Sequence, residues 1–522
     1  MNSVRRRTAR ALLVGLGAVL LVLGSLPGAG DAQGARPSIR VRLQFSPARN
    51  LDPVYRTRAA DYFVYYNIFS HLVRWKPGTA ELEPDLAERW EVSPDGRVWT
   101  FHLRKGVQFH KGFGEVTAED VKFTFDRFTD KDVASPNASS WEGVERIEVV
   151  DRYTVRFRLK QPNLAFVANP IAGRESMIVS KRAVQQRGRN FARDPIGSGP
   201  FVFSRWTAAD EVVVTANDQY FRGRPQVAAI TFVPILEEAV AVAALERGDV
   251  HVIWTRGSPD AIEVLRRNRA LTIDVARRPS SVRTLAFNPD VDLFRDVRIR
   301  QALAHAVNKR ELEAASGGTL TPTDHLLVDT PWMRKAAAER RFPIYRYDPS
   351  RAKRLLQEAG QPRLRFVLTF PLRSPDPLIA QILAEQFRRV GVEVELNGVE
   401  QAAWNTRLIR TGQFQVTVRG IARGLDPDEL ARDQFHSSAV PPGDNIARYN
   451  RADALIDAAA RERDPAKRQE LYITLMRQVL ADLPYLPLAN DTLVAAWRAP
   501  VRTMVTGIDN DFPGFTIQVV RP

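Results

Sequence analysis

The sequence predicts an α/β protein that contains more than one domain, and three observations lead to this expectation. The chain has 522 residues, which is too long for one compact hydrophobic core. Residues 364–370, 377–390 and 392–396 have the patterns of a strand, a helix and a strand in succession. The short loop at 389–391 implies that the two strands are joined by a parallel crossover. Period-two alternation over 144–159 predicts a β-hairpin elsewhere in the chain.

Residues 1–32 have the pattern of a secretion signal. Four arginines between positions 5 and 10 precede an apolar run of 13 residues at 11–23. That run is shorter than the ~20 residues that a membrane-spanning helix needs. Small residues follow at 30–32, so we expect a signal peptide over 1–32 that is cleaved near Ala32. An uncleaved membrane anchor is the alternative.

The composition bears on location and on partners. The chain contains no cysteine, so we expect a large core rather than disulfides to stabilise it. Without the cysteine on which lipoproteins are acylated, we expect an unlipidated periplasmic protein. The net charge is +15, and removing residues 1–32 takes away four arginines and one aspartate and leaves +12. Because the arginines are spread along the chain, they indicate a solvated basic surface and not a nucleic-acid partner.

The most regular series of local signals lies between residues 83 and 128. A turn at 93–96, of sequence SPDG, separates two strand patterns. Thr117 then begins a capping-box variant, Thr-Ala-Glu-Asp, and a helix pattern follows it. A hairpin, a loop and a capped helix are therefore expected in this order.

Further elements are expected along the whole chain. A Gly-Ser-Gly turn at 197–199 is expected to bend the backbone where strands lead towards a ligand. The remaining predicted strands are 38–45, 414–418 and 486–495, and the remaining predicted helices are 61–73, 237–247, 296–307, 402–411, 452–461 and 466–480, with a loop at 420–428.

Several of these stretches resemble one family in the same order. They are the 83–128 block, the turn at 194–201 and the helical sequence RDVRIRQALAHAVNKREL at 295–312. Together they resemble the large extracellular solute-binding proteins that serve peptide, nickel and related ABC importers, and the resemblance covers essentially all of residues 38–500. It implies a two-lobed periplasmic-binding-protein fold of type II. In that fold an extra subdomain is inserted into the first lobe, and the ligand lies in a cleft between the lobes.

The resemblance also implies domain boundaries. The first lobe takes residues 36–50, 190–280 and 485–522, the inserted subdomain takes 51–189, and the second lobe takes 281–484. The chain would cross between lobes near 278–284 and near 483–489, and these crossings would form a hinge. Closure of the hinge on a ligand that contacts both lobes would enclose that ligand, as a Venus flytrap does.

The function implied by the resemblance is that of the solute-binding component of an ABC importer. Such a protein captures a peptide-like or other small organic ligand and delivers it to permease transmembrane subunits with their ATPase. A monomer without a cofactor is expected. A periplasmic chaperone or sensor on the same fold is one alternative, and a secreted hydrolase is another. Against the hydrolase and against a metal site, the seven histidines are scattered, and neither H-E-x-x-H nor G-x-S-x-G occurs.

The loop at 420–428 is where the sequence departs from the peptide binders of this family. Those proteins carry a Trp there and, three residues later, an Asp that pairs with the free amine of the peptide. Counting back from Asp426, these two positions are occupied by Gly420 and Arg423. A guanidinium cannot stabilise an ammonium group, but it binds a carboxylate or phosphate in a bidentate manner. We therefore expect a ligand with an anionic group, such as a modified peptide, an opine or a sugar acid.

Arg423 is the expected anion ligand, and the alternative is that it points to solvent or pairs with Asp426. The other expected site residues are Asp426 in the same loop, Trp404, Asn445 and Tyr449 for stacking and hydrogen bonding, and Phe45 and Ser46 at the end of the first strand.

Overall fold

The computed structural model describes residues 36–44, 50–55, 59–174, 176–207, 211–255, 258–405, 411–422, 424–441, 443–506 and 512–520. Arg36–Val520 form one compact unit. The expected signal peptide over 1–32 lies outside the described residues. None of the helices within those residues is both long enough and apolar enough to cross a membrane.

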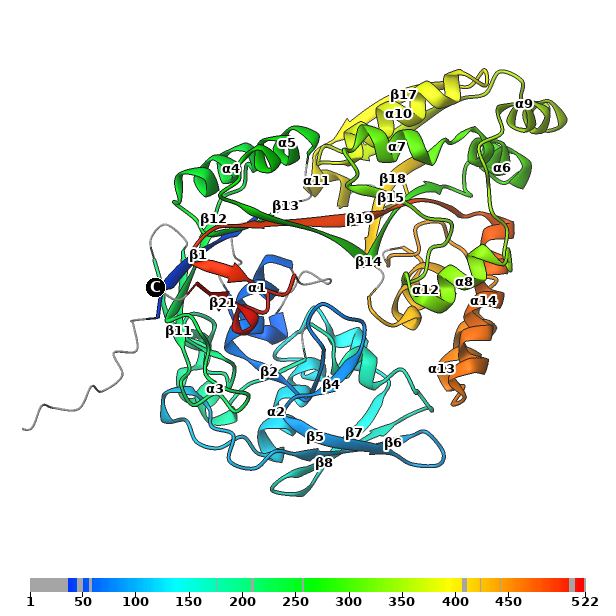
Figure 1. The fold of residues 1–522 in the computed structure, drawn as a ribbon. Coiled ribbons are helices and arrows are strands. Elements are labelled where there is room, and N and C mark those ends of the chain that lie inside the picture. The colour runs from blue at the N-terminus through cyan, green and yellow to red at the C-terminus, as the bar shows by residue number, and fades with distance from the viewer. Residues whose placement is uncertain are drawn as a thin grey trace, which may run out of the picture. The chain divides into compact units, whose positions relative to one another are not determined.

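One large mixed sheet runs through this unit (Figure 1). In order across the sheet its strands are β10 (Phe201–Trp206), β11 (Val212–Ala216), β12 (Ala229–Pro234), β1 (Ser38–Leu43), β13 (Val252–Thr255), β19 (Tyr485–Trp497), β14 (Thr272–Phe287), β18 (Val416–Ala422), β16 (Arg365–Pro371) and β17 (Glu393–Val399). β15 (Leu320–Pro322) pairs with β19 beside this path. The pairs β1–β12 and β16–β17 are parallel, which confirms the crossover predicted over residues 364–396.

Two long antiparallel strands, β14 and β19, connect the two halves of this sheet. They pair along most of their length, with shifts in register between Arg277 and Val282 and again before Thr284. Residues 494–497 of β19 also pair with β13, whereas residues 281–287 of β14 pair with β18. Each of the two strands therefore takes part in both halves of the sheet.

A separate four-stranded sheet forms where the local sequence signals are most regular. Its order is β5 (Ala87–Val92), β6 (Val98–Leu103), β8 (Thr154–Leu159) and β7 (Val144–Asp151). Gly96 N donates to Ser93 O at 2.9 Å in the turn of the first hairpin, and Gly96 has a φ of 70°. α2 (Ala118–Thr129) packs on this sheet, with the ring centroids of Phe125 and Phe157 5.3 Å apart. The two hairpins, the turn and the capped helix predicted here are confirmed.

Helices cover both faces of the large sheet. α4 (Glu238–Arg247) and α5 (Pro259–Arg267) lie on one face near β13, and α1 (Ala59–Ile68) lies on the other (Figure 1). The other α-helices are α3 (Lys181–Arg187), α6 (Val297–Ala306), α7 (Lys309–Ala315), α8 (Pro331–Ala338), α9 (Pro349–Glu358), α10 (Asp376–Arg388), α11 (Gln401–Ala403), α12 (Pro427–Phe435), α13 (Asp453–Arg461) and α14 (Pro465–Asp482). The short strands are β2 (Ser70–His71), β3 (Val73–Trp75), β4 (Leu82–Pro84), β9 (Met177–Ile178), β20 (Val501–Thr503) and β21 (Gln518–Val519).

The buried hydrophobic residues that the structure describes fall into separate clusters. One cluster draws all of its buried members from residues 282–489. A second draws its members from residues 39–254 and 493–517. A smaller one lies around α4 and α5 and takes its buried members from 241–265 together with two residues of β19. The change from one main cluster to the other falls within β14 and β19.

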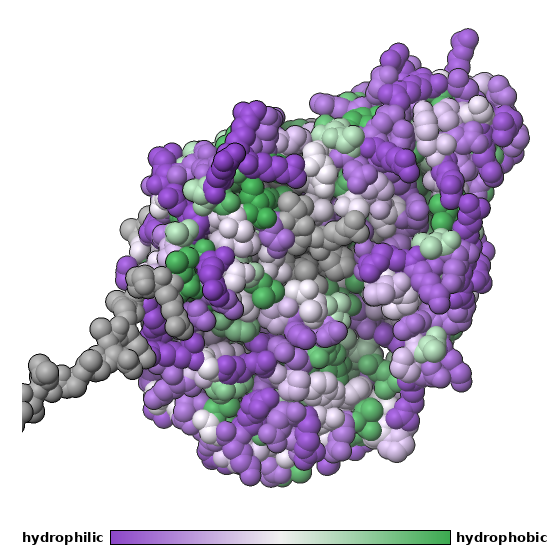
Figure 2. All heavy atoms as spheres, viewed as in Figure 1, coloured by the Kyte–Doolittle hydropathy of each residue, from purple (hydrophilic) through white to green (hydrophobic). Residues whose placement is uncertain are grey.

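Polar side chains cover most of the face of the molecule that Figure 2 shows, and hydrophobic residues appear there in small separate patches. Exposed arginines are held by nearby acids, as in the pairs Arg224–Asp218 and Arg388–Glu385, both at 2.9 Å. This mixture of charges is typical of a solvated protein surface.

The predicted helix at 61–73 is wrong in its second half. α1 ends at Ile68, and β2 and β3 follow it. A distant segment packs against this end, where Gly199 N donates to Ile68 O at 2.9 Å and a Cβ atom at Gly197 would lie 2.1 Å from the same oxygen. Neither glycine has a positive φ. The 197–199 turn therefore needs glycines for close approach to α1, which the sequence analysis did not anticipate.

Two expectations in the second half of the chain need smaller corrections. β18 continues to Ala422 and α12 begins at Pro427, so the connection between them is shorter than the predicted loop at 420–428. Of the helix predicted at 402–411, α11 accounts for the beginning, and residues 406–410 lie outside the described residues.

The capping box of α2 provides a test of the fold. Asp120 Oδ2 accepts hydrogen bonds from Thr117 N at 3.0 Å and from Thr117 Oγ1 at 2.9 Å, and its Oδ1 accepts one from Lys181 N, at the start of α3, at 3.0 Å. We predict that Asp120→Ala lowers the free energy of unfolding by about 1–3 kcal/mol, because these largely buried donors lose their acceptor. Urea denaturation measures the change.

Asp126→Ala is the matched control on the same helix. Asp126 is exposed and pairs only with Lys122, at 2.7 Å, among the described residues. Its loss is expected to cost about 0.3–0.5 kcal/mol. Equal losses in the two variants would contradict the role assigned to Asp120.

Candidate functional site

A buried ion cluster lies where β14 and β19 run side by side. Arg283 on β14 donates from Nε to Asp491 Oδ1 at 2.8 Å and from Nη2 to Asp491 Oδ2 at 3.1 Å. Its Nη1 donates to Oδ1 of Asp376, the first residue of α10, at 2.6 Å. All three side chains are at most 4% exposed. The cluster joins β14, β19 and α10 through charge-assisted hydrogen bonds.

The charges in this cluster support one another. Burial alone would lower the pKa of Arg283, but the carboxylates of Asp376 and Asp491 raise it above its ordinary value. The guanidinium therefore stays charged. Losing one partner of a buried ion pair leaves an uncompensated charge, which costs about 3–5 kcal/mol.

Gly420 on β18 packs directly against this guanidinium. The two residues are partners in the β14–β18 register. A Cβ atom at Gly420 would lie 2.8 Å from Arg283 Nη1 and 2.9 Å from its Cζ. A side chain at position 420 would have to displace a buried group that holds two carboxylates. The packing of Arg283 thus explains why a glycine occupies position 420, where the peptide binders of the family carry a tryptophan.

A cavity of about 460 Å³, here called the cleft cavity, opens between two segments that are distant in sequence. Trp75, Leu82 and Leu164 line it from one segment, and Trp332, Asp426 and Tyr472 line it from the other. Trp75 lies on β3 and Trp332 on α8, so each side contributes one tryptophan. The cavity is open to solvent, and its lining combines these aromatic rings with charged side chains such as Asp426 and Arg468. A concave space in which aromatic and polar groups converge is typical of a site for a small organic molecule.

Two hydrogen-bonded contacts, here called the bridging contacts, join the same two segments beside the cleft cavity. Arg463 Nη1 donates to Pro94 O, in the turn between β5 and β6, at 2.6 Å. Leu164 N donates to Ala460 O, near the end of α13, at 2.9 Å. Both Arg463 and Leu164 also line the cavity. The cavity is therefore closed on this side by main-chain acceptors and one arginine.

Asp426 lies at the wall of the cleft cavity but is already paired. It caps α12, where its carboxylate accepts a hydrogen bond from Asp428 N at 2.8 Å. Arg468 on α14 donates to both of its oxygens, at 2.7 Å and 2.9 Å. Because the pair is bidentate and only 12–20% exposed, its charge is largely neutralised within the protein.

Trp404 and Asn445 interact with the interior of the protein. Trp404 is 5% exposed, and its Nε1 donates to Thr417 Oγ1 on β18 at 3.2 Å. Asn445 is completely buried, and its Nδ2 donates to His436 O at 3.1 Å and to Tyr449 O at 2.6 Å. Neither residue lines the cleft cavity.

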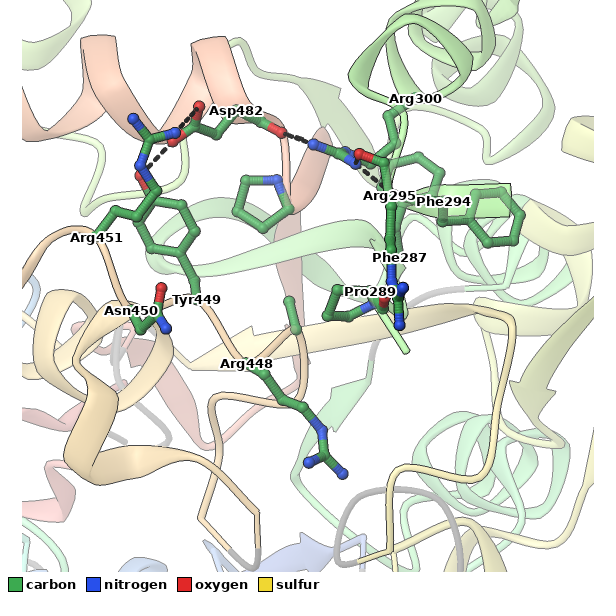
Figure 3. Close-up of a pocket in the computed structure, with 12 residues that line it drawn as sticks. Phe287, Pro289, Phe294, Arg295, Arg300, Arg448, Tyr449, Asn450, Arg451 and Asp482 are labelled. Atoms are coloured by element: carbon green, nitrogen blue, oxygen red, sulfur yellow. Dashed lines mark hydrogen bonds and ion pairs between the residues drawn. The ribbon is translucent and has the colours of Figure 1, made fainter. Parts of the chain in front are cut away.

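Tyr449 lines a different cavity, of about 250 Å³, here called the distal pocket (Figure 3). Its hydroxyl donates to Asp482 Oδ2 at 2.7 Å, and burial followed by this hydrogen bond raises the pKa of Tyr449 well above its ordinary value. The structure thus brings Asn445 and Tyr449 together and places both apart from Asp426. Arg423, Phe45 and Ser46 lie outside the described residues.

Histidines do not form a metal centre in the part of the chain that the structure describes. No group of three or more His, Asp or Glu side chains is placed there to hold a metal ion. His71 and His110 are buried, and burial lowers their pKa to about 3 and about 4. His110 Nε2 is hydrogen-bonded to Gly199 O at 3.0 Å.

Sequence reasoning missed Arg283, Trp75 and Trp332. Trp75 and Trp332 carry no spacing signal, because they are brought together only by the packing of distant segments. For Arg283 the signal was indirect. A glycine at position 420 indicates that a neighbour fills the space, but it does not say which neighbour.

Comparisons with known proteins agree with this architecture. The model of the family described as bacterial extracellular solute-binding proteins, family 5, matches residues 81–441. The chain is 30% identical over 467 residues to di/tripeptide-binding protein 2 of Pseudomonas aeruginosa, which covers 83% of this chain and 86% of that protein.

Two solved structures are also similar. One is an ABC transporter-associated periplasmic binding protein of Helicobacter pylori in complex with the peptide STSA, with a TM-score of 0.78 and 27% identity, covering 92% of this chain and 98% of that one. The other is the binding protein MoaA of A. tumefaciens R10 in complex with mannopinic acid, with a TM-score of 0.76, 28% identity and the same coverage.

These likenesses confirm the predicted α/β periplasmic-binding-protein fold of type II. The family model spans more than half of the chain, and the similarity to the Pseudomonas protein extends over most of both sequences. The large sheet joined by two crossing strands is therefore that of a solute-binding protein, and the chain belongs to family 5 of the bacterial extracellular solute-binding proteins.

Proposed function

We propose that this solute-binding protein is the periplasmic component of an ABC importer, which encloses a small organic anion between two lobes and delivers it to a membrane permease. The cleft cavity is the observation that carries the proposal, because its walls come from residues 75–168 and from residues 330–472. Its volume of about 460 Å³ lies within the range of ~300–1,000 Å³ that is usual for small-molecule sites. The importer role is supported by the Helicobacter relative, which is described as associated with an ABC transporter.

The two proposed lobes account for the separate hydrophobic clusters. The second lobe, residues 281–484, would contain nearly all of the cluster drawn from 282–489. The first lobe would consist of residues 36–50, 190–280 and 485–522, with residues 51–189 inserted, and the second cluster spreads over both of these parts. Because β14 and β19 carry the crossings, rotation about them would open the cleft cavity and leave each cluster intact.

The anionic ligand class rests on Arg423 and on the surroundings of its loop. Arg423 stands where peptide binders carry the acid that holds the peptide amine. Asp426, the described acid nearest to it in the sequence, is held by Arg468 in a bidentate pair, so little negative charge remains there for an ammonium group. The relative MoaA, whose bound ligand is mannopinic acid, shows that a protein of similar fold takes an organic acid.

A di- or tripeptide is the second candidate ligand, because the Pseudomonas relative is named for binding such peptides. The guanidinium of Arg283 fills the space beside Gly420, which removes the aromatic wall of the peptide-binder pattern and counts against this candidate. Trp404, Asn445, Tyr449, Phe45 and Ser46 stay predictions as ligand contacts.

Closure should depend on the bridging contacts. We predict that Arg463→Ala weakens solute binding by about 0.5–1.5 kcal/mol, because the closed form loses the hydrogen bond to Pro94 O. Isothermal titration with the solute measures the affinity, and small-angle scattering should show a smaller radius of gyration when the wild type is saturated.

Arg461→Ala is the control for this experiment. Arg461 is an exposed neighbour that pairs with Asp457 of its own helix at 4.0 Å and makes no bridging contact among the described residues. If both variants bind alike, the bridging contacts contribute nothing. If saturation leaves the radius of gyration unchanged, hinge closure itself is wrong.

The ligand class is tested through Arg423. Mass spectrometry of small molecules that co-purify with the protein should recover organic anions. Arg423→Ala is expected to weaken the binding of such an anion by roughly 2–5 kcal/mol, as when one partner of a desolvated charge pair is removed. Recovery of plain peptides with free amines would overturn the anion assignment, and unchanged affinity in the variant would place the anion elsewhere.

Export supplies a further test. We propose that residues 1–32 are a signal peptide and that the mature protein is a periplasmic monomer without lipid, since it has no cysteine to acylate. The intact mass of protein isolated from its native cell envelope should correspond to a chain that begins near Gln33. A chain that begins at Met1, or one that fractionates with the inner membrane, would contradict this proposal.

A further inference from the structure

The distal pocket and the loop that follows β18 lie at opposite ends of that strand. Phe287, which lines it, is the register partner of Val416, the first residue of β18. The loop that carries Arg423 follows Ala422, at the other end of the same strand. At about 3.3 Å per residue, β18 separates the two places by roughly 20 Å. The distal pocket is therefore distinct from the cleft cavity.

Positive charge predominates around the distal pocket. Arg295, Arg300, Arg448 and Arg451 line it, and Asp482 is the one acid among its lining residues. Figure 3 shows Asp482 between Arg451 and Arg300, with bonds to both. Asp292 and Asp290, which lie outside the lining, pair with Arg295 at 3.0 Å and with Arg448 at 3.1 Å. Asp296, whose field also acts on Arg300, is itself paired with Arg298 at 2.7 Å, so these five arginines exceed the four acids around them by one.

Arg300 is the cation without a carboxylate partner. Its Nε and Nη2 donate to the main-chain oxygen of Asp482 at 3.1 Å and 2.5 Å, and its Nη1 donates to the carbonyl oxygens of Phe294 and Arg295. Within the described part of the chain, no carboxylate lies within ion-pair distance of it. Burial lowers the pKa of Arg300, and the fields of Asp482, Asp296 and Tyr345 raise it only in part. An anion in the pocket would offset this uncompensated charge.

The rest of the pocket suits a short apolar group. Phe287 and Phe294 are at most 2% exposed, and Pro484 is also buried, so they provide an apolar floor below the arginines. The volume of about 250 Å³ is below the ~300–1,000 Å³ of most small-molecule sites, so only a compact ligand fits. An arginine beside aromatic rings binds a planar carboxylate through its donors and an attached ring through its face.

We propose that the distal pocket is a second binding site, which takes a small organic anion with one carboxylate on a compact apolar or aromatic body. All of its lining residues lie between 287 and 484, within the proposed second lobe. Binding of a ligand to the distal pocket therefore does not require closure of the cleft. The site therefore stands independently of the proposed transport function.

Benzoate is a suitable probe, and benzamide is its neutral analogue. Ligand-observed NMR titration of the full mature protein should show binding of benzoate that weakens with added salt, and no comparable binding of benzamide. Asp482→Asn should tighten benzoate binding by about two- to fivefold, because the acid of the pocket loses its charge while its side-chain oxygen can still accept from Tyr449.

Arg451→Gln should weaken benzoate binding by a similar factor, since it removes a cation and leaves Asp482 without its 2.8 Å partner. Arg247→Gln, an exposed change on α4, is the matched control and should leave binding unaltered. Arg423→Ala should also leave it unaltered. Absence of benzoate binding, insensitivity to both Asp482→Asn and Arg451→Gln, or loss of binding in Arg423→Ala would each overturn the proposal.

Discussion

The guanidinium of Arg283 is completely buried at the point where β14 and β19 cross from one half of the sheet to the other. A charge in this position is tolerated because Asp491 and Asp376 each accept from it at hydrogen-bonding distance. The three residues come from β14, β19 and α10, so the relative placement of these elements is fixed by one charge and its two partners. Hydrophobic contacts are less directional than these hydrogen bonds. The two main hydrophobic clusters lie on either side of the crossing.

The same interaction limits which residue can stand on the neighbouring strand β18. Arg283 faces Gly420 across the β14–β18 pair and occupies the space that a side chain would need. The residue at this position of β18 is therefore not independent of the packing between β14 and β19. A protein with an aromatic residue at position 420 would need a different side chain at 283 and a different arrangement of Asp376 and Asp491. The residue at position 420 and the packing of the crossing are thus set by the same few side chains.

The sequence predicted an element correctly where residues close to it in the chain determine its structure. The SPDG turn, the Thr117–Asp120 capping box and the parallel crossover at 364–396 each have their causes within a few tens of residues, and all were predicted. The end of α1 could not be predicted, because it is set by Gly197 and Gly199, more than 120 residues further along the chain. The two tryptophans of the cleft cavity lie still further apart, so no periodicity connects them.

Charge at a site is harder to predict than the identity of its residues, and Asp426 illustrates the reason. As a residue type it would suit the amine of a peptide, and it does line the cleft cavity. Arg468 on α14, two helices further along the chain, donates to both of its oxygens, so its negative charge is neutralised inside the protein. In the distal pocket the opposite holds, because Arg300 is surrounded by carbonyl oxygens and keeps its net charge. Whether a charged side chain can serve a ligand is therefore decided by its tertiary partners, and these two residues differ in that respect although both line cavities.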